Sequence, residues 1–120
     1  MDENFKILRY ELLELISDFQ DATTLAYKNL LDSSDKKSLT NLHHLNNAYA
    51  NFVGFKNFLH SQPNMQHYEL SSLITMWENL YGEMLEVFND NDSNTSWMYS
   101  RFETTNQQFE SVKEFLVPQD

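Results

Sequence analysis

Apolar side chains recur every three or four residues over four long stretches of the chain, and short polar runs separate the stretches. This spacing places the apolar side chains on one face of an α-helix. The first stretch runs from about Asp2 to Leu31, and the second ends at about His60. The third spans roughly Met65 to Phe88, and the fourth covers about Ser96 to Leu116. The pattern predicts four α-helices.

The side chains expected to form the core are the apolar members of these four stripes. They are Phe5, Leu8, Leu12, Leu15, Ile16, Phe19, Ala22, Ala26, Leu30, Leu42, Leu45, Tyr49, Phe52, Leu59, Leu70, Leu73, Ile74, Trp77, Leu80, Tyr81, Met84, Phe88, Met98, Phe102, Phe109, Val112 and Leu116. One side of each helix is expected to pack against the others, and the polar side is expected to face water.

Polar runs mark where the helices end. Residues 32–35 carry short polar side chains that can cap a following helix. Pro63 disfavours helical geometry at the residue before it, and Pro118 is expected to close the last helix. Long helices joined by short loops fold back on their neighbours, so we expect an all-α, antiparallel (up-down) four-helix bundle. The sequence leaves open whether the first helix continues through Thr23 and Thr24.

Composition agrees with this expectation. A chain of 120 residues with 41% hydrophobic content can build one core, so residues 1–120 are expected to form a single helical domain. Two glycines and two prolines are too few for the frequent turns of a sheet protein. The first residues are acidic, unlike a signal peptide, and no apolar run reaches about 18 residues. We therefore expect a cytoplasmic protein with no membrane partner.

The formal net charge of −10 restricts the partners. Direct nucleic-acid binding is not expected, because it depends on neutralising phosphates with basic side chains. Residues 1–63 carry 8 acids and 6 bases, whereas residues 64–120 carry 10 acids and 2 bases. A basic partner is therefore expected to approach the C-terminal half.

Metal ligands do not occur at the spacings that metal sites require. The histidines are His43, His44, His60 and His67, and none has the glutamate three residues earlier that di-iron bundles use. The run from Asp90 to Asn94 matches the first half of an EF-hand loop, but Thr95 and Arg101 occupy the positions that need glycine and glutamate. No metal and no cofactor are expected.

Catalytic motifs are also missing from the sequence. There is no cysteine nucleophile, no G-x-S-x-G and no glycine-rich phosphate loop. Two glutamate pairs, Glu11 with Glu14 and Glu83 with Glu86, lie among polar neighbours on faces turned away from the core stripe. We expect no enzymatic activity, and no motif identifies a known family.

Several side chains remain that a simple bundle core does not need. Placing each residue around its helix axis puts five aromatic side chains outside the core stripes, namely Tyr10, Phe58, Tyr68, Trp97 and Phe115. A polar and acidic row lies along the fourth helix, and a comparable row on the first helix consists of Glu11, Glu14, Asp18 and Asp21. The residues predicted to bind a partner are Glu103, Gln107, Glu110, Glu114, Trp97, Phe58, Tyr10 and Tyr68.

The sequence therefore predicts a non-enzymatic protein-binding module. The leading hypothesis is a small acidic inhibitor, with the profile of immunity proteins, antitoxins and phage inhibitors, that occupies a basic functional surface of its partner. The alternative is a secretion or assembly chaperone that binds an amphipathic segment in a groove between helices. A third hypothesis is an acidic mimic of nucleic acid. The sequence also leaves a homo-oligomer open.

Overall fold

The computed structural model describes residues 3–117, with side chains from residue 6 onward. The side chain of Phe5, expected in the core, and Pro118 as a whole lie outside this description. The elements, in chain order, are α1 (Glu3–Asp32), α2 (Leu39–Ser61), the 3₁₀ helix η1 (Pro63–Met65), α3 (Tyr68–Asp90) and α4 (Ser96–Leu116). No β-strand occurs in residues 3–117, so the predicted all-α class is confirmed.

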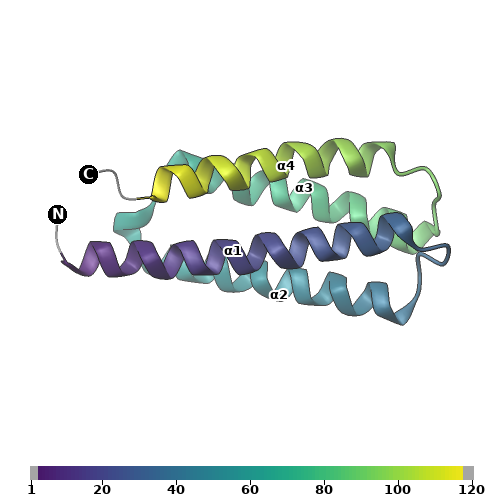
Figure 1. Ribbon diagram of the computed structural model, residues 1–120, viewed down its shortest axis with the longest axis horizontal. Helices are drawn as coiled ribbons and strands as arrows, with labels where there is room; N and C mark the ends of the chain where they lie inside the picture. The colour runs from purple at the N-terminus through teal and green to yellow at the C-terminus, as the bar shows by residue number, and fades with distance from the viewer. Residues whose placement is uncertain (1–2, 118–120) are drawn as a thin grey trace.

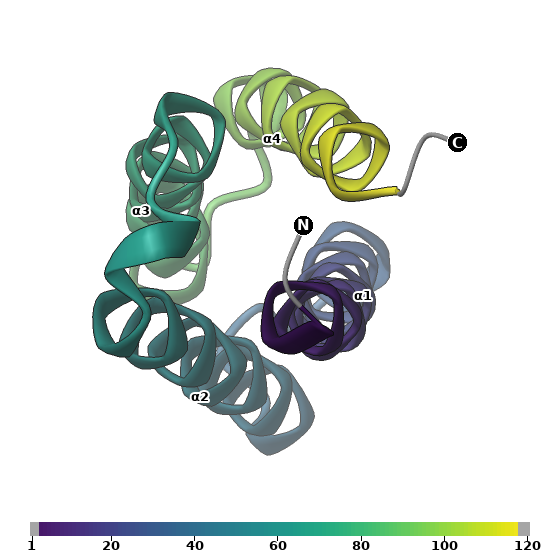
Figure 2. The ribbon, with the colours of Figure 1, turned by 90° about the vertical axis from the view of Figure 1, so that its left-hand side faces the viewer.

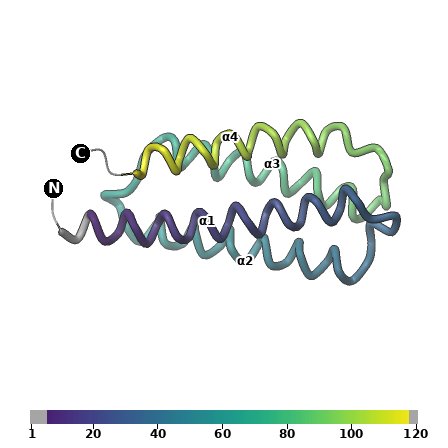
Figure 3. The backbone as a smooth tube through the Cα atoms, viewed as in Figure 1, coloured from purple at the N-terminus to yellow at the C-terminus, as the bar shows by residue number. Residues whose placement is uncertain are grey.

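The helices run alternately up and down along an elongated bundle of 50 × 23 × 20 Å (Figure 1). Around the bundle axis they follow the order α1, α2, α3, α4, so each helix lies beside its neighbours in sequence and α4 returns to α1 (Figure 2). The loops 33–38 and 91–95 lie at one end, and the α2–α3 connection lies at the other (Figure 3). The predicted antiparallel bundle is confirmed.

Local capping explains the helix ends. The Ser38 hydroxyl accepts a hydrogen bond from the backbone N–H of Asn41 at 3.1 Å and so caps α2. The expected start of the third helix at Met65 is wrong. Pro63 begins a single 3₁₀ turn, after which Gln66 and His67 are extended, and His67 Nδ1 caps α3 by accepting from the backbone N–H of Glu69.

The centre of the core is an aromatic cluster to which every helix contributes. The Phe19 ring on α1 lies 5.8 and 5.5 Å from those of Phe52 and Phe55 on α2, measured between ring centroids. It lies 5.3 Å from Trp77 on α3 and 5.0 Å from Phe109 on α4. Because Phe19 contacts all three other helices, this cluster joins the α1–α2 hairpin to the α3–α4 hairpin.

Most of the predicted core residues are buried, but α2 is rotated relative to the expectation. Leu42 and Tyr49 were expected inside and are 38% and 46% exposed. Phe58 was expected on the back of α2 and instead is half-buried against the core. The residues of α2 that are buried are Asn41, Leu45, Ala48, Phe52, Phe55 and Leu59. Predicted core residues that lie half-buried at the margin are Leu8, Leu15, Ile74, Tyr81 and Phe88.

Helix α1 is continuous through the two threonines, and Thr23 has a definite role there. Its buried hydroxyl donates to the backbone carbonyl of Phe19 at 2.8 Å, within the same helix. The same oxygen accepts a hydrogen bond from Nε1–H of Trp77 at 2.8 Å. A fully buried indole N–H needs an acceptor, so Thr23 satisfies the polar atom that Trp77 brings into the core.

Replacing Thr23 with valine is expected to lower the free energy of unfolding by about 1–3 kcal/mol, because the Trp77 N–H then loses its acceptor while the shape of the side chain is kept. Urea denaturation followed by circular dichroism measures the change. Thr24→Val is the matched control, since Thr24 is only half-buried and makes no such bond to Trp77. Equal effects of the two substitutions would contradict the assignment.

The two loops at one end of the bundle are bonded to each other. The backbone N–H of Lys36 donates to Oδ1 of Asn91 at 2.9 Å, and Asn91 ends α3 in the left-handed conformation, with φ at 48°. The buried Asn41 donates from Nδ2 to the hydroxyl of Ser33 at 2.9 Å and to the carbonyl of Lys36 at 3.0 Å. The bond between Lys36 and Asn91 therefore joins the turns of the two hairpins.

Candidate functional site

The acidic row predicted on α4 is solvent-exposed along its whole length. Glu103, Gln107, Glu110 and Glu114 are all exposed, and their spacing of three or four residues places them on one outer face of the helix. None of them contributes to the core. The row is therefore free to contact a partner, and its role in binding remains a prediction.

Glu110 connects this row to α1. Gln20 on α1 donates from Nε2 to Oε2 of Glu110 and to Oδ1 of Asn106, both at 2.9 Å. Lys113 forms an ion pair with Glu110 at 2.8 Å, one turn along α4. The hydrogen bonds from Lys113 and then Gln20 lower the pKa of Glu110, so this carboxylate stays ionised to lower pH than usual.

A second acidic row follows the outer face of α1. Glu11, Glu14, Asp18 and Asp21 are all exposed and lie three or four residues apart. Among the described residues none of the four takes part in an ion pair. Gln20 reaches Glu110 from the side of α1 that faces α4, so the α4 row borders α1. The α1 row lies on the other side of α1, toward α2, where its side chains line hollows together with residues of α2. We call these four residues together with Glu103, Glu110 and Glu114 the acidic surface.

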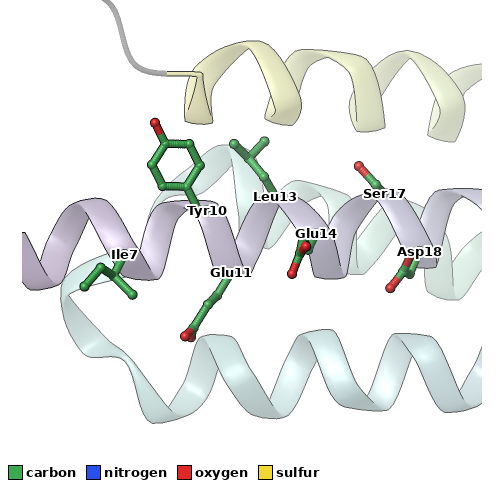
Figure 4. A pocket seen from close by; sticks show the side chains of 7 residues that line it. All are labelled: Ile7, Tyr10, Glu11, Leu13, Glu14, Ser17 and Asp18. Carbon is green, nitrogen blue, oxygen red and sulfur yellow. The ribbon is translucent and has the colours of Figure 1, made fainter.

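The α1 row lines three adjoining hollows, which share Asp18. The largest measures about 610 Å³ and lies along α1 between two rows of side chains (Figure 4). Tyr10 and Leu13 point from α1 toward α4, and Glu11 projects on the opposite side of the helix (Figure 4). The two smaller hollows measure about 290 and 320 Å³ and extend this surface toward α2.

Two of the aromatic residues predicted to bind a partner lie at these hollows. Tyr10 is 60% exposed and lines the largest one, and Phe58 lines the neighbouring hollow between α1 and α2. Ile7 and Leu25 are also exposed, and they lie near the two ends of the acidic row on α1. The carboxylates are thus accompanied by apolar surface, which interfaces use for contact area.

The other two predicted aromatic residues lie elsewhere. Tyr68 and Trp97 are 70% and 71% exposed, and each lines a hollow on the α3–α4 hairpin. The predicted binding residues therefore do not form one surface. Tyr10 and Phe58 accompany the acidic row of α1, whereas Tyr68 and Trp97 belong to a separate face.

The remaining titratable groups with shifted pKa values belong to the packing of the bundle. Burial raises the pKa of Tyr27, helped by the nearby Glu103, and its ring stacks on Phe102 with centroids 3.9 Å apart. Burial likewise raises the pKa of Tyr81, beside Tyr49. No group of three or more His, Asp or Glu side chains in the described part of the chain is arranged to hold a metal ion.

Comparisons with protein-family models, curated proteins and solved structures return no match. No helix among the described residues is long and apolar enough to cross a membrane. The surfaces described above are therefore the basis for a proposed function, and the acidic surface carries seven exposed carboxylates.

Proposed function

We propose that the chain is a non-enzymatic, cytoplasmic protein-binding module that uses the acidic surface to cover a basic functional surface of a partner protein and so inhibit it. One observation carries the proposal. Seven carboxylates lie exposed on the outer faces of α1 and α4, and the one ion pair found among the side chains of residues 6–117 is that of Lys113 with Glu110. Such a surface attracts a basic partner before contact is made.

The expected complex combines charge with apolar contact. Unpaired carboxylates raise the association rate and select a basic partner, but exposed charge pairs add little affinity by themselves. The exposed side chains of Ile7, Tyr10 and Leu25 supply apolar area next to the α1 row. Tyrosine is enriched among the residues that dominate binding energy, so Tyr10 is the candidate anchor.

The chaperone hypothesis predicts a different surface. An amphipathic segment binds in a groove whose floor is largely apolar. The hollows between α1 and α2 are bordered by Glu11, Glu14, Asp18 and Asp21. A segment bound there would itself have to be basic, and its binding would depend on salt. The geometry therefore supports the inhibitor proposal better.

The test is a pair of triple charge reversals that carry the same net charge. Glu11→Lys, Glu14→Lys and Asp18→Lys change the acidic surface, whereas Glu78→Lys, Glu86→Lys and Asp90→Lys change exposed positions of α3. The partner is captured from the native host with the wild-type protein and then purified. Surface plasmon resonance at low and physiological salt measures the association rate with each variant.

The α1 variant is expected to associate roughly 10-fold or more slowly than the wild type at low salt, and the difference should shrink as salt rises. The α3 variant is expected to stay within roughly 3-fold of the wild type, because its changed residues lie away from the acidic surface. Circular dichroism should show that both variants keep the helical fold. An equal loss in both variants would show that only net charge matters, and no loss in either would reject the proposal.

A further inference from the structure

The groove between α3 and α4 differs chemically from the acidic surface. Two hollows of about 200 and 330 Å³ share Met76, and they are lined by Trp97, Tyr68, Arg101, an asparagine and six serine or threonine side chains. No carboxylate lines either hollow. We call this region, together with the exposed Phe115, the aromatic face.

We propose that the aromatic face is where two copies of this chain meet as an antiparallel, two-fold symmetric dimer. Charge is the first argument. Each chain carries a net charge of −10, so two copies repel each other wherever their carboxylates would face one another. The hollows of the aromatic face carry no carboxylate, so a second copy can approach there without opposing acids.

Composition is the second argument. Tryptophan, tyrosine and arginine are the residue types that contribute most to binding energy at interfaces. Trp97, Tyr68 and Arg101 are all exposed on this face. Serine and threonine hydroxyls between such anchors supply adaptable hydrogen bonds. Two large aromatic side chains that are about 70% exposed present apolar area that a second copy would remove from water.

The position of the aromatic side chains is the third argument. Trp97 lies at the start of α4. At the other end of α4, Phe115 stacks on His67 with ring centroids 4.2 Å apart, and His67 lies 4.5 Å from Tyr68. Eighteen residues of helix span about 27 Å between these ends. An antiparallel two-fold axis near the middle of α4 therefore places Trp97 of each copy over the Phe115 end of the other.

The same symmetry gives Arg101 a partner. Arg101 makes no ion pair within residues 3–117. Glu69 lies at the Phe115 end of the face, where its carboxylate accepts from Nε2 of Gln108 at 2.8 Å. Antiparallel pairing brings Arg101 of one copy toward Glu69 of the other, and the two-fold axis repeats this pair. The dimer also keeps α1 free, because α1 and α3 lie on different sides of α4 (Figure 2).

Sedimentation equilibrium of the wild-type chain over a wide concentration range tests the dimer. We expect a concentration-dependent dimer whose dissociation constant rises at least roughly 10-fold in Trp97→Ala. Tyr10→Ala is the matched control, since Tyr10 is also exposed but lies on α1 outside the aromatic face. Quenching of tryptophan fluorescence by acrylamide is a second measurement of the dimer. Trp77 is fully buried, so acrylamide reaches mainly Trp97, and dimer formation should reduce the quenching.

A mixing experiment tests the antiparallel arrangement. Arg101→Glu and Glu69→Lys are each expected to weaken the homodimer, because each places two like-charge pairs at the interface. Mixed in equal amounts, the two variants should form a heterodimer, in which both pairs are of opposite charge again. Unchanged thermal unfolding at low concentration would show that the variants fold.

A wild-type chain that stays monomeric at high concentration would overturn the proposal. Equal weakening by Trp97→Ala and Tyr10→Ala would also overturn it, and so would the absence of a heterodimer in the mixture. If Trp97 is required for binding a different protein while the chain itself is monomeric, the aromatic face belongs to that protein and the dimer is rejected. Failure of the dimer would leave the acidic surface on α1 untouched.

Discussion

Replacing Phe19 with alanine is expected to lower the free energy of unfolding by about 3–5 kcal/mol. The Phe19 ring is fully buried and contacts aromatic rings on α2, α3 and α4. Removing it leaves a cavity among large rings that cannot close over the space, so the loss exceeds the transfer free energy of the side chain alone. Because a domain of this size is stable by about 5–15 kcal/mol, the loss is a large share of the total.

Urea denaturation gives the change in unfolding free energy, provided that the slope of the transition is unchanged. Tyr10→Ala on the same helix is the control, and it should change the stability by no more than about 0.5 kcal/mol because Tyr10 is exposed. A change of less than about 1.5 kcal/mol for Phe19→Ala would mean that the two hairpins are joined mainly by contacts away from the aromatic cluster.

The sequence was sufficient to predict four helices and their antiparallel arrangement. Apolar periodicity and the polar runs between helices are local signals, and short loops leave few other topologies. The structure places the helix bounds within a few residues of the prediction. The start of α3 was missed, because Met65 continues the apolar stripe and is buried even though it belongs to the 3₁₀ turn that Pro63 begins.

The rotation of α2 was harder to predict because this helix carries apolar residues on several sides. Leu42 and Tyr49 extend one possible stripe, whereas Ala48 and Phe55 extend another. Alanine gives a weak apolar signal, yet Ala48 is fully buried. Which stripe faces the core depends on the neighbouring helices, and a single helix viewed along its axis does not contain that information.

The candidate site could be predicted in part from the sequence. The acidic rows of α1 and α4 are each visible as residues three or four apart. Their placement relative to the other helices was not, because it depends on contacts between residues distant in sequence: Gln20 bonds to Glu110 of the α4 row, whereas the α1 row lies toward α2. For the same reason the sequence showed that Tyr10 and Trp97 point outward but not that they lie on different faces.

Lys36 shows what periodicity misses altogether. A lysine in a polar run between helices ordinarily reads as a solvated surface charge. Here the side chain is buried and folds back over the end of α1, where its ammonium donates to the carbonyl of Leu30 at 2.7 Å and to that of Ser33. The last carbonyls of a helix lack hydrogen-bond donors within the helix and carry a partial negative charge. The ammonium supplies the hydrogen bonds and also a positive charge.

Replacing Lys36 with methionine is therefore expected to lower the free energy of unfolding by about 2–4 kcal/mol, since methionine keeps much of the apolar stem but removes the ammonium that donates to the carbonyls of Leu30 and Ser33. Lys37→Met is the matched control. Lys37 is the next residue and is exposed, so its loss should change the stability by no more than about 0.5 kcal/mol. Thermal and urea unfolding of both variants give the comparison.

The bond from the backbone N–H of Lys36 to Asn91 is kept in the methionine variant. The difference in stability between the two variants therefore measures the contribution of the ammonium alone. Equal stabilities would show that water replaces the ammonium at the end of α1 without loss.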